Sequence, residues 1–166
     1  MKMLFTGAVK SGKSSRALQA AQAWGAPVTF IATAAITDDE IRVRVQRHQA
    51  ERAALGWETI EEQVEIHKAL RNAGDSVLLD CLPMWVNNVC YYKRQHDFEL
   101  ILEDFLDALS QKKNCALVTN ETGWGNIPFD EATRAYNMML ANANKKIAAA
   151  ADTVELLVCG IPVKVK

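Results

Sequence analysis

The chain has 166 residues, of which 49% are hydrophobic and 23% are charged, and its formal net charge is -1. This length and composition predict a single domain over residues 1–166 and exclude a disordered chain, a collagen-like fibre and a small disulfide scaffold. The near-neutral charge argues against a nucleic-acid partner, and no apolar run is long enough to span a bilayer.

The predicted elements alternate between strands and helices. In chain order they are strand 3–6, helix 14–24, strand 28–32, helix 38–55, strand 76–79, helix 98–111, strand 115–119, helix 130–151 and a hairpin of strands 153–159 and 162–165. The strands are short and continuously apolar, which is typical of a parallel sheet buried on both faces. We therefore expect a three-layer α/β fold, with a mostly parallel sheet, helices on both faces and an antiparallel hairpin at the C-terminal edge.

The cysteines give no sign of a disulfide framework or of a metal site. Cys81, Cys90, Cys115 and Cys159 are scattered, with neither a Cys-x-x-Cys pair nor metal-ligand spacing. The N-terminus also lacks the apolar core and cleavage site of a signal peptide. We expect a cytoplasmic protein whose cysteines serve as small apolar residues.

Residues 7–14 match the phosphate-loop pattern Gly-x-x-x-x-Gly-Lys-Ser/Thr between a predicted strand and a predicted helix. Gly7 and Gly12 allow the tight turn that brings backbone N–H groups close to phosphate oxygens. Lys13 would reach the β- and γ-phosphates, and the Ser14 hydroxyl would bind Mg²⁺. This motif predicts a P-loop NTPase-type fold that binds a nucleoside triphosphate.

An acidic metal ligand is expected where a neighbouring strand ends. Asp80 directly follows the apolar residues 77–79 and fits that position. Aspartate is also a common turn residue, but beside a phosphate loop we favour the Mg²⁺ role.

The histidine His48 stands between two arginines at helical spacing. Arg44, His48 and Arg52 are four residues apart, which places them on one helix face. The cations would disfavour protonation of the imidazole and hold phosphate oxygens, so that a neutral His48 could attack a phosphate. From the spacing alone, a solvated helix face remains the more common interpretation. His67 and His96 lie in polar sequence, and we expect them at the surface.

Taken together, these motifs resemble one family, the bifunctional adenosylcobinamide kinase / adenosylcobinamide-phosphate guanylyltransferase of cobalamin biosynthesis. Its most specific motif, Arg-Ile/Val-x-x-His-x-x-x-Arg followed by Trp-x-Thr-x-Glu, is matched at residues 44–52 and 57–61. The other matched segments are Ile-Ala-Thr at 31–33, Asn-Glu-x-Gly-x-Gly-x-x-Pro at 120–128, the alanine-rich 148–154 and Gly-Ile-x-Val-Lys at 160–164. The resemblance therefore extends over the whole chain.

The resemblance implies two reactions with ATP or GTP, Mg²⁺ and a corrinoid. Adenosylcobinamide is phosphorylated on its aminopropanol hydroxyl, and GTP then gives GMP through His48 to this phosphate, yielding adenosylcobinamide-GDP. Lys13 and His48 would be the catalytic residues. The positions implied to bind nucleotide are Gly7, Ala8, Val9, Lys10, Ser11, Gly12, Lys13, Ser14, Thr33, Ala34, Ala35, Gln49, Ala50, Glu51, Arg52, Glu61 and Asp80. The family is usually homo-oligomeric, with the active site near a subunit contact.

Several positions depart from the family pattern. Ala53 stands where proline is usual, and the late helix has Asn137, Met138, Ala141 and Lys145 in place of Arg, Asp, Gly and Gln. Two alternatives therefore stay open: a P-loop small-molecule kinase without guanylyltransferase activity, and a non-catalytic GTP-binding module.

The kinase base is also open at this point, since both Asp80 and Glu121 are candidates. The sequence does not decide between the two carboxylates.

Overall fold

The computed structural model describes residues 1–35, 39–125 and 127–166. Within the second helix, seven side chains are outside this description: Glu40, Ile41, Arg44, Arg47, His48, Glu51 and Arg52. The expected helix start at Thr37 and Asp38, and Asn126 of the loop motif, also lie outside the described residues.

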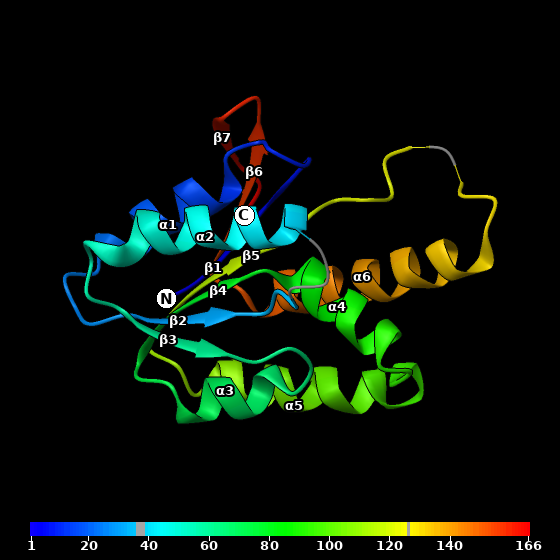
Figure 1. Cartoon of the computed structure of the whole chain (residues 1–166), viewed down its shortest axis with the longest axis horizontal. Coiled ribbons are helices and arrows are strands. Elements are labelled where there is room, and N and C mark those ends of the chain that lie inside the picture. Colours follow the sequence, from blue (N-terminus) through cyan, green and yellow to red (C-terminus); the bar gives the residue numbers. More distant parts are fainter. Residues whose placement is uncertain (36–38, 126) are drawn as a thin grey trace.

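Strands and helices alternate along the described chain, as Figure 1 shows. The elements are β1 (Lys2–Gly7), α1 (Lys13–Gln22), β2 (Thr29–Ala32), α2 (Asp39–Ala53), β3 (Glu58–Glu61), α3 (Ile66–Asn72), β4 (Ser76–Asp80), α4 (Leu82–Tyr91), the 3₁₀ turn η1 (Gln95–Asp97), α5 (Phe98–Ser110), β5 (Asn114–Val118), α6 (Glu131–Ala150), β6 (Thr153–Val158) and β7 (Ile161–Lys164). The predicted elements all exist, with ends shifted by a few residues at most.

The strands form one sheet in the order β3-β2-β4-β5-β1-β6-β7. Every neighbouring pair is parallel except β6–β7, which is antiparallel and lies at one edge. The expected three-layer α/β architecture with a C-terminal edge hairpin is therefore confirmed.

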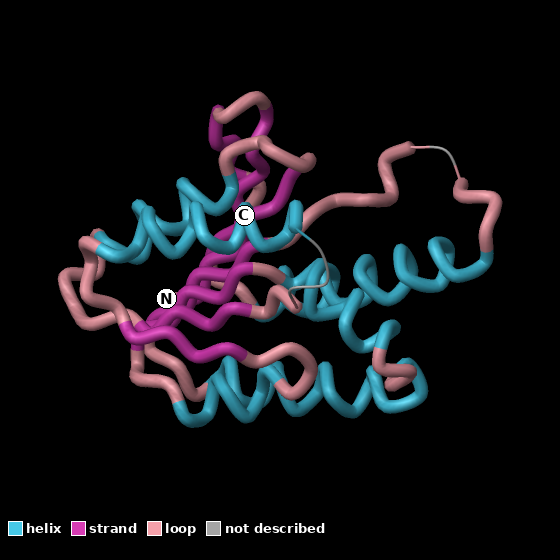
Figure 2. The backbone as a smooth tube through the Cα atoms, in the orientation of Figure 1, coloured by secondary structure: helices cyan, strands magenta, loops and turns pink. Residues whose placement is uncertain are grey.

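Helices cover both faces of this sheet (Figure 2). Alternate residues of β4 show the division, because Leu78 packs in the core formed with α1, whereas Val77 and Leu79 pack in the larger core formed with α3 to α6. α2 lies on the same side as α1 (Figure 1). Right-handed crossovers require this arrangement, because the chain moves toward the β3 edge through α1 and α2 and in the opposite direction through α3 to α6.

Four of the described elements were not predicted from the sequence: β3, α3, α4 and the short 3₁₀ turn η1. β3 is an edge strand whose residues Glu58 and Glu61 are exposed, so it lacks the apolar run expected of a buried strand. α4 is almost wholly apolar on its buried side, and Pro83 near its start is a helix-start signal in the sequence.

The described helices include none with the length and apolar character that a membrane crossing requires. Cys81 and Cys115 are buried, Cys90 is half-buried and Cys159 is exposed. The expectation of small apolar residues thus holds for the buried pair but is wrong for Cys159, which occupies the β6–β7 turn with a positive φ of 51°. Burial raises the pKa of the Cys115 thiol to about 12, so this thiol stays protonated.

Candidate functional site

The phosphate loop connects β1 to α1 and has the backbone shape that its glycines require. Gly7 has a φ of 142° and Gly12 a φ of 94°, both in the region that favours glycine. Lys13 begins α1 and is buried, and its Nζ donates hydrogen bonds to the carbonyl oxygen of Ala8 and to Ser11 Oγ, the latter at 3.4 Å. The ammonium group therefore points back over the loop that is expected to surround the phosphates.

The β6–β7 hairpin supports the phosphate loop from one side. The backbone N–H of Gly160 donates to the carbonyl oxygen of Ser11 at 3.1 Å. A Cβ atom on Gly7 would lie 2.5 Å from the carbonyl oxygen of Leu157, so β6 approaches the loop more closely than a side chain would permit. The edge hairpin thus fixes the shape of the loop in addition to extending the sheet.

Glu61 and Asp80, which were predicted from sequence, lie at the carboxyl ends of β3 and β4, the two strands that flank β2. Ala32 of β2 is in register with Glu61 of β3 on one side and with Asp80 of β4 on the other. Residues in register point to the same face of a parallel sheet, and Ala32 packs in the core formed with α1. Both side chains therefore point to the α1 side at the carboxyl edge of the sheet, and ligands of open α/β sheets bind beyond that edge.

The segment after β2 is held by hydrogen bonds to the end of β4. The Thr33 hydroxyl, fully buried, donates to the carbonyl oxygen of Cys81 at 2.7 Å and accepts from the Cys81 N–H at 2.9 Å. Asn88, on α4, donates from Nδ2 to the carbonyl oxygens of Thr33 at 2.7 Å and of Gln63 at 3.0 Å. The predicted residues Thr33, Ala34 and Ala35 are thus joined to the Asp80 end of the sheet.

The buried residue Asn88, which makes these contacts, was not predicted from the sequence. Its only signal was an amide within the apolar segment 82–90, where a polar side chain needs buried partners.

The helix α2 carries His48, and its backbone and eight of its fifteen side chains are described. The predicted residues His48, Glu51 and Arg52 lie on α2, but their side chains are outside the described part of the chain. Gln49 and Ala50 are exposed. The helix lies on the same side of the sheet as the phosphate loop (Figure 1).

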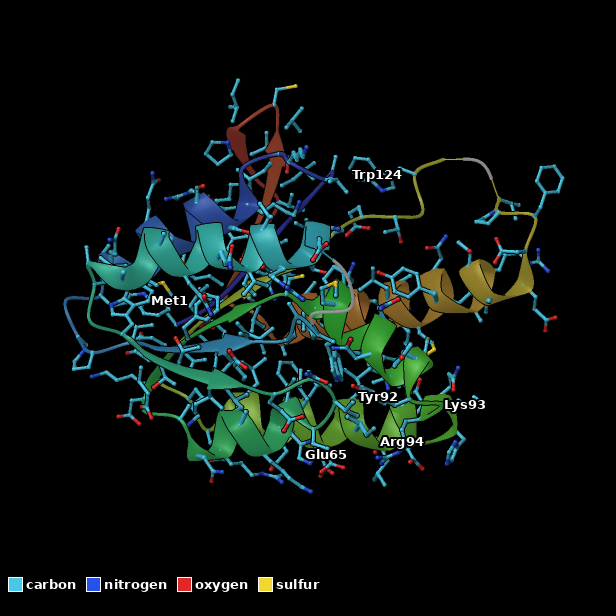
Figure 3. The ribbon with its side chains drawn as sticks, viewed as in Figure 1. Met1, Glu65, Tyr92, Lys93, Arg94 and Trp124 are labelled. Atoms are coloured by element: carbon cyan, nitrogen blue, oxygen red, sulfur yellow. The ribbon has the colours of Figure 1, made fainter. Side chains whose placement is uncertain are left out.

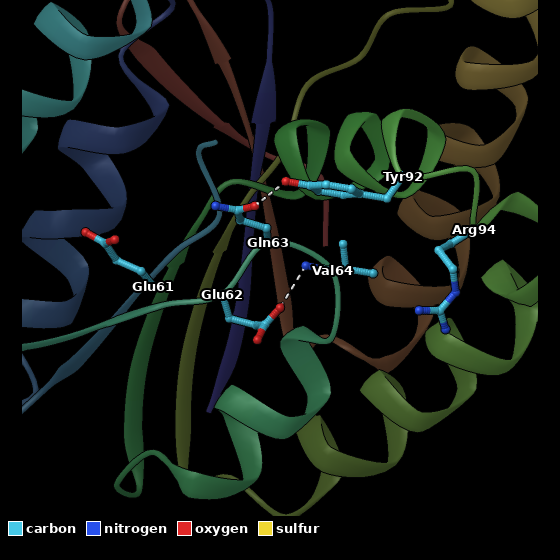
Figure 4. A pocket seen from close by; sticks show the side chains of 6 residues that line it. All are labelled: Glu61, Glu62, Gln63, Val64, Tyr92 and Arg94. Carbon is cyan, nitrogen blue, oxygen red and sulfur yellow. Dashed lines mark hydrogen bonds between the residues drawn. The ribbon is translucent and has the colours of Figure 1, made fainter. Parts of the chain in front are cut away.

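An open hollow of about 530 Å³ lies beside the end of β3 (Figure 4). It is lined by Glu61, Glu62, Gln63, Val64, Tyr92 and Arg94. Figure 4 shows Glu61 directed away from Glu62, toward the helices on the other side of the sheet, while the Glu62 carboxylate accepts from the N–H of Val64 at 2.9 Å. Glu62 is therefore a structural residue of the turn, and Glu61 alone of this pair faces the side of the sheet that carries α1 and α2.

The turn that follows α4 closes this hollow from the other side. The Tyr92 hydroxyl donates to Gln63 Oε1 at 2.8 Å. Arg94 Nη1 forms an ion pair with Glu65 Oε1 at 3.7 Å, and Figure 3 labels both residues. Both contacts join the β3–α3 segment to the end of α4.

His67 was expected at the surface, and that expectation is wrong. It lies on α3, is 6% exposed, and its Nδ1 has no hydrogen-bond partner among the described residues. Burial lowers its pKa, and the cations Arg71 and Lys68 act in the same direction, against Asp104 and Glu65. His96 is exposed, as expected.

Two side chains of the late helix α6 bind the backbone of other segments. Arg134 donates to the carbonyl oxygen of Pro128 at 2.9 Å, and the Tyr136 hydroxyl donates to that of Pro83 at 3.4 Å. These two side chains therefore stabilise the structure. Of the four replaced residues, Asn137 is half-buried and Met138, Ala141 and Lys145 are exposed.

Comparison with known proteins gives a consistent family assignment. The model of the family described as "Cobinamide kinase / cobinamide phosphate guanyltransferase" matches residues 3–165. The bifunctional adenosylcobalamin biosynthesis protein CobP of Pseudomonas aeruginosa is 34% identical over 170 residues, covering 100% of this chain and 98% of that protein. The CobU proteins of the same description from Salmonella typhimurium and Escherichia coli are 33% and 31% identical over 183 residues, with full coverage of both partners.

Proposed function

Because this chain belongs to the cobinamide kinase / cobinamide phosphate guanyltransferase family, it is a transferase, and we propose that it acts twice on adenosylcobinamide. First, a nucleoside triphosphate phosphorylates the corrinoid hydroxyl. Second, GTP gives GMP to the new phosphate and releases pyrophosphate. The observation that carries this proposal is the phosphate loop of residues 7–14 between β1 and α1, in a chain that the family model matches over residues 3–165.

We propose that the GMP transfer proceeds through His48. The imidazole would attack the α-phosphorus of GTP and displace pyrophosphate, and the corrinoid phosphate would then displace His48. Two features support this proposal: the spacing of Arg44, His48 and Arg52 along α2, and the position of α2 on the phosphate-loop side of the sheet. Covalent catalysis divides one difficult transfer into two displacements.

The test is to trap the labelled protein after incubation with α-labelled GTP. The wild type should retain a label that is stable in base and labile in acid, as expected of a phosphoramidate. His48→Ala should retain none, whereas His96→Ala is the matched control at an exposed site and should label normally. Undiminished label in His48→Ala would exclude the histidine intermediate. Phosphorylation of the corrinoid without any labelling of the protein would favour a simple kinase. Nucleotide binding without turnover would favour a non-catalytic module.

We propose Mg²⁺ as the metal of the kinase step. Ser14, in the first turn of α1, and Asp80, at the end of β4, offer a hydroxyl and a carboxylate, and both residues are half-buried. Mg²⁺ prefers such oxygen ligands and takes its remaining ligands from water and substrate phosphates, so the donor set fits. When bound, Mg²⁺ would neutralise phosphate charge. Asp80→Asn should raise the Mg²⁺ concentration needed for half-maximal activity, and an unchanged requirement would remove Asp80 from this role.

We also propose that the chain acts as a homo-oligomer. Trp124, Ile127 and Phe129 in the loop after β5 are 73%, 82% and 104% exposed, and such neighbouring apolar side chains are typical of interaction surfaces. Light scattering coupled to gel filtration should give a multiple of the chain mass. A single monomer peak at micromolar concentration would contradict this proposal.

A further inference from the structure

Glu121 lies beside the phosphate loop, in the segment that follows β5. β1 and β5 are neighbours in the sheet, but β1 continues into α1 on one face and β5 leads to α6 on the other. Chains that leave two adjacent strands toward opposite faces open a crevice at their carboxyl ends. The Glu121 N–H donates to the carbonyl oxygen of Gly7 at 3.4 Å, which places this residue against the first glycine of the loop.

The Glu121 carboxylate is oriented through one of its two oxygens. Glu121 Oε1 accepts from Thr6 Oγ1 at 3.2 Å and from Asn144 Nδ2 at 3.5 Å. Asn144 is itself fixed, because its Oδ1 accepts from the buried Thr119 hydroxyl at 2.6 Å and its Nδ2 donates to the carbonyl oxygen of Asn120 at 2.9 Å. The half-buried carboxylate thus has a defined position beside the phosphate loop.

The second oxygen of this carboxylate is available to a substrate. Glu121 Oε2 forms no hydrogen bond and no ion pair with any residue in the described part of the chain. An ionised carboxylate can accept several hydrogen bonds, so a donor from a bound molecule can be accommodated here. A carboxylate held at one oxygen and open at the other is the arrangement expected of a general base.

We infer that Glu121 is the general base of the kinase step, an inference that rests on the proposed function. Glu121 Oε2 accepts the proton of the corrinoid hydroxyl as the hydroxyl oxygen attacks the γ-phosphorus. The new O–P bond forms while the bond between the γ-phosphorus and the β–γ bridging oxygen breaks, and the nucleoside diphosphate leaves with the electron pair. The carboxylate then releases the proton to water. Thr6 and Asn144 are positioning residues.

The location of Asp80 makes it the weaker candidate. Asp80 ends β4, and β5 separates β4 from the strand that carries the phosphate loop. Its proposed role as a metal ligand also commits its oxygens to Mg²⁺. Glu121, in contrast, is directly hydrogen bonded to Gly7.

The test measures the two half-reactions of Glu121→Gln separately. Glutamine has the same shape and still offers an oxygen to Thr6 and Asn144, but it cannot accept the proton. Phosphorylation of cobinamide from γ-labelled nucleotide should fall about 100-fold or more in kcat, the usual effect of losing a general base, with KM for the nucleotide little changed. GMP transfer from α-labelled GTP to preformed cobinamide phosphate should stay close to wild type, because its acceptor needs no deprotonation by Glu121.

The outcomes separate this inference from the proposed function. A kinase rate in Glu121→Gln within a few fold of wild type, or an equal fall in both half-reactions, would overturn the role as base. If the wild type itself catalysed neither half-reaction, the proposed function would fail instead.

The positioning role is tested at Thr6. Because Thr6 is buried, the stability of each variant is also measured by thermal unfolding. Thr6→Val removes the hydrogen bond to Glu121 and should lower kcat of phosphorylation about 10-fold while GMP transfer is retained. Thr6→Ser restores the hydroxyl and should recover most of the kinase rate. Equal kinase rates in the valine and serine variants would exclude Thr6 from positioning the base.

Discussion

Arg16 in α1 forms two parallel hydrogen bonds with Glu155 in β6, from Nε to Oε2 at 2.8 Å and from Nη2 to Oε1 at 2.9 Å. The hydrogen bond to Glu155, more than the charge alone, raises the pKa of the guanidinium and keeps it ionised. The pair joins the helix that follows the phosphate loop to the strand next to β1. Like the hydrogen bond between Gly160 and Ser11, this pair therefore connects the phosphate-loop region to the β6–β7 hairpin.

We predict that Arg16→Lys will lower the free energy of unfolding by about 1 kcal/mol, because lysine cannot form both hydrogen bonds. A double-mutant cycle with Glu155→Gln, followed by urea unfolding, should give a coupling energy of about 1–2 kcal/mol. Strictly additive effects would show that the pair contributes nothing beyond its separate side chains.

We predict that Thr33→Val will destabilise the protein by about 1–3 kcal/mol, because the N–H and carbonyl groups of Cys81 lose a buried partner. Affinity for GTP should also fall, since the segment 33–35 is held in place by these bonds. Thr33→Ser is the matched control and retains both hydrogen bonds. Chemical unfolding and GTP titration check both effects, and identical results for the two variants would contradict the role of the hydroxyl.

We predict that Gly7→Ala will reduce affinity for GTP at least about 10-fold, because the added Cβ would lie 2.5 Å from a backbone oxygen and the φ of 142° is strained for alanine. Gly123→Ala is the control, since a Cβ there meets no atom within 4 Å. Calorimetric titration of both variants with GTP provides the measurement. Equal affinities would mean that the loop adapts without the support of β6.

We predict that Lys13→Ala will lower the rate of phosphoryl transfer by about 100-fold or more, the scale on which preorganised charged donors act. The buried ammonium already points over the loop through its contacts with Ala8 and Ser11. Lys93→Ala, at an exposed turn, should leave the rate unchanged. A near-normal rate for Lys13→Ala would show that the phosphate-loop assignment is wrong.

We predict that His67 makes the protein less stable in acid. Because burial lowers the pKa of His67 in the folded state below the ordinary 6.5, the unfolded chain binds a proton that the folded chain does not. The free energy of unfolding therefore falls as the pH falls from about 6.5 toward the folded-state pKa. His67→Leu should lose less stability than wild type between pH 7.5 and pH 5, whereas the exposed His96→Leu should follow the wild type.

The parts of the site that are local in the chain could be predicted from the sequence. Residues 7–14 were identified because the backbone of a phosphate loop requires glycine at two positions, a requirement that is visible in the residue types themselves. The family resemblance rested on similar short segments, and the full-length match to the family model confirms it. The positions of the buried strands could also be predicted, because continuous apolar runs are visible in the sequence itself.

What lay outside these local signals was missed or left open. β3 was missed because an exposed edge strand carries charge in place of an apolar run, and His67 was placed at the surface because its polar neighbours in sequence are not its neighbours in space. The role of Glu121 could not be separated from that of Asp80, since both simply follow apolar strands.

The sequence by itself thus determined the fold class, the phosphate loop and the family. Only the tertiary structure decided which acidic residue lies against Gly7 and which side chains hold its carboxylate in place. The physical reason is that strand order is set by long-range packing: β5 lies between β4 and β1, and Asn144 reaches Glu121 across 23 positions of the chain. No local pattern of residues encodes such a contact.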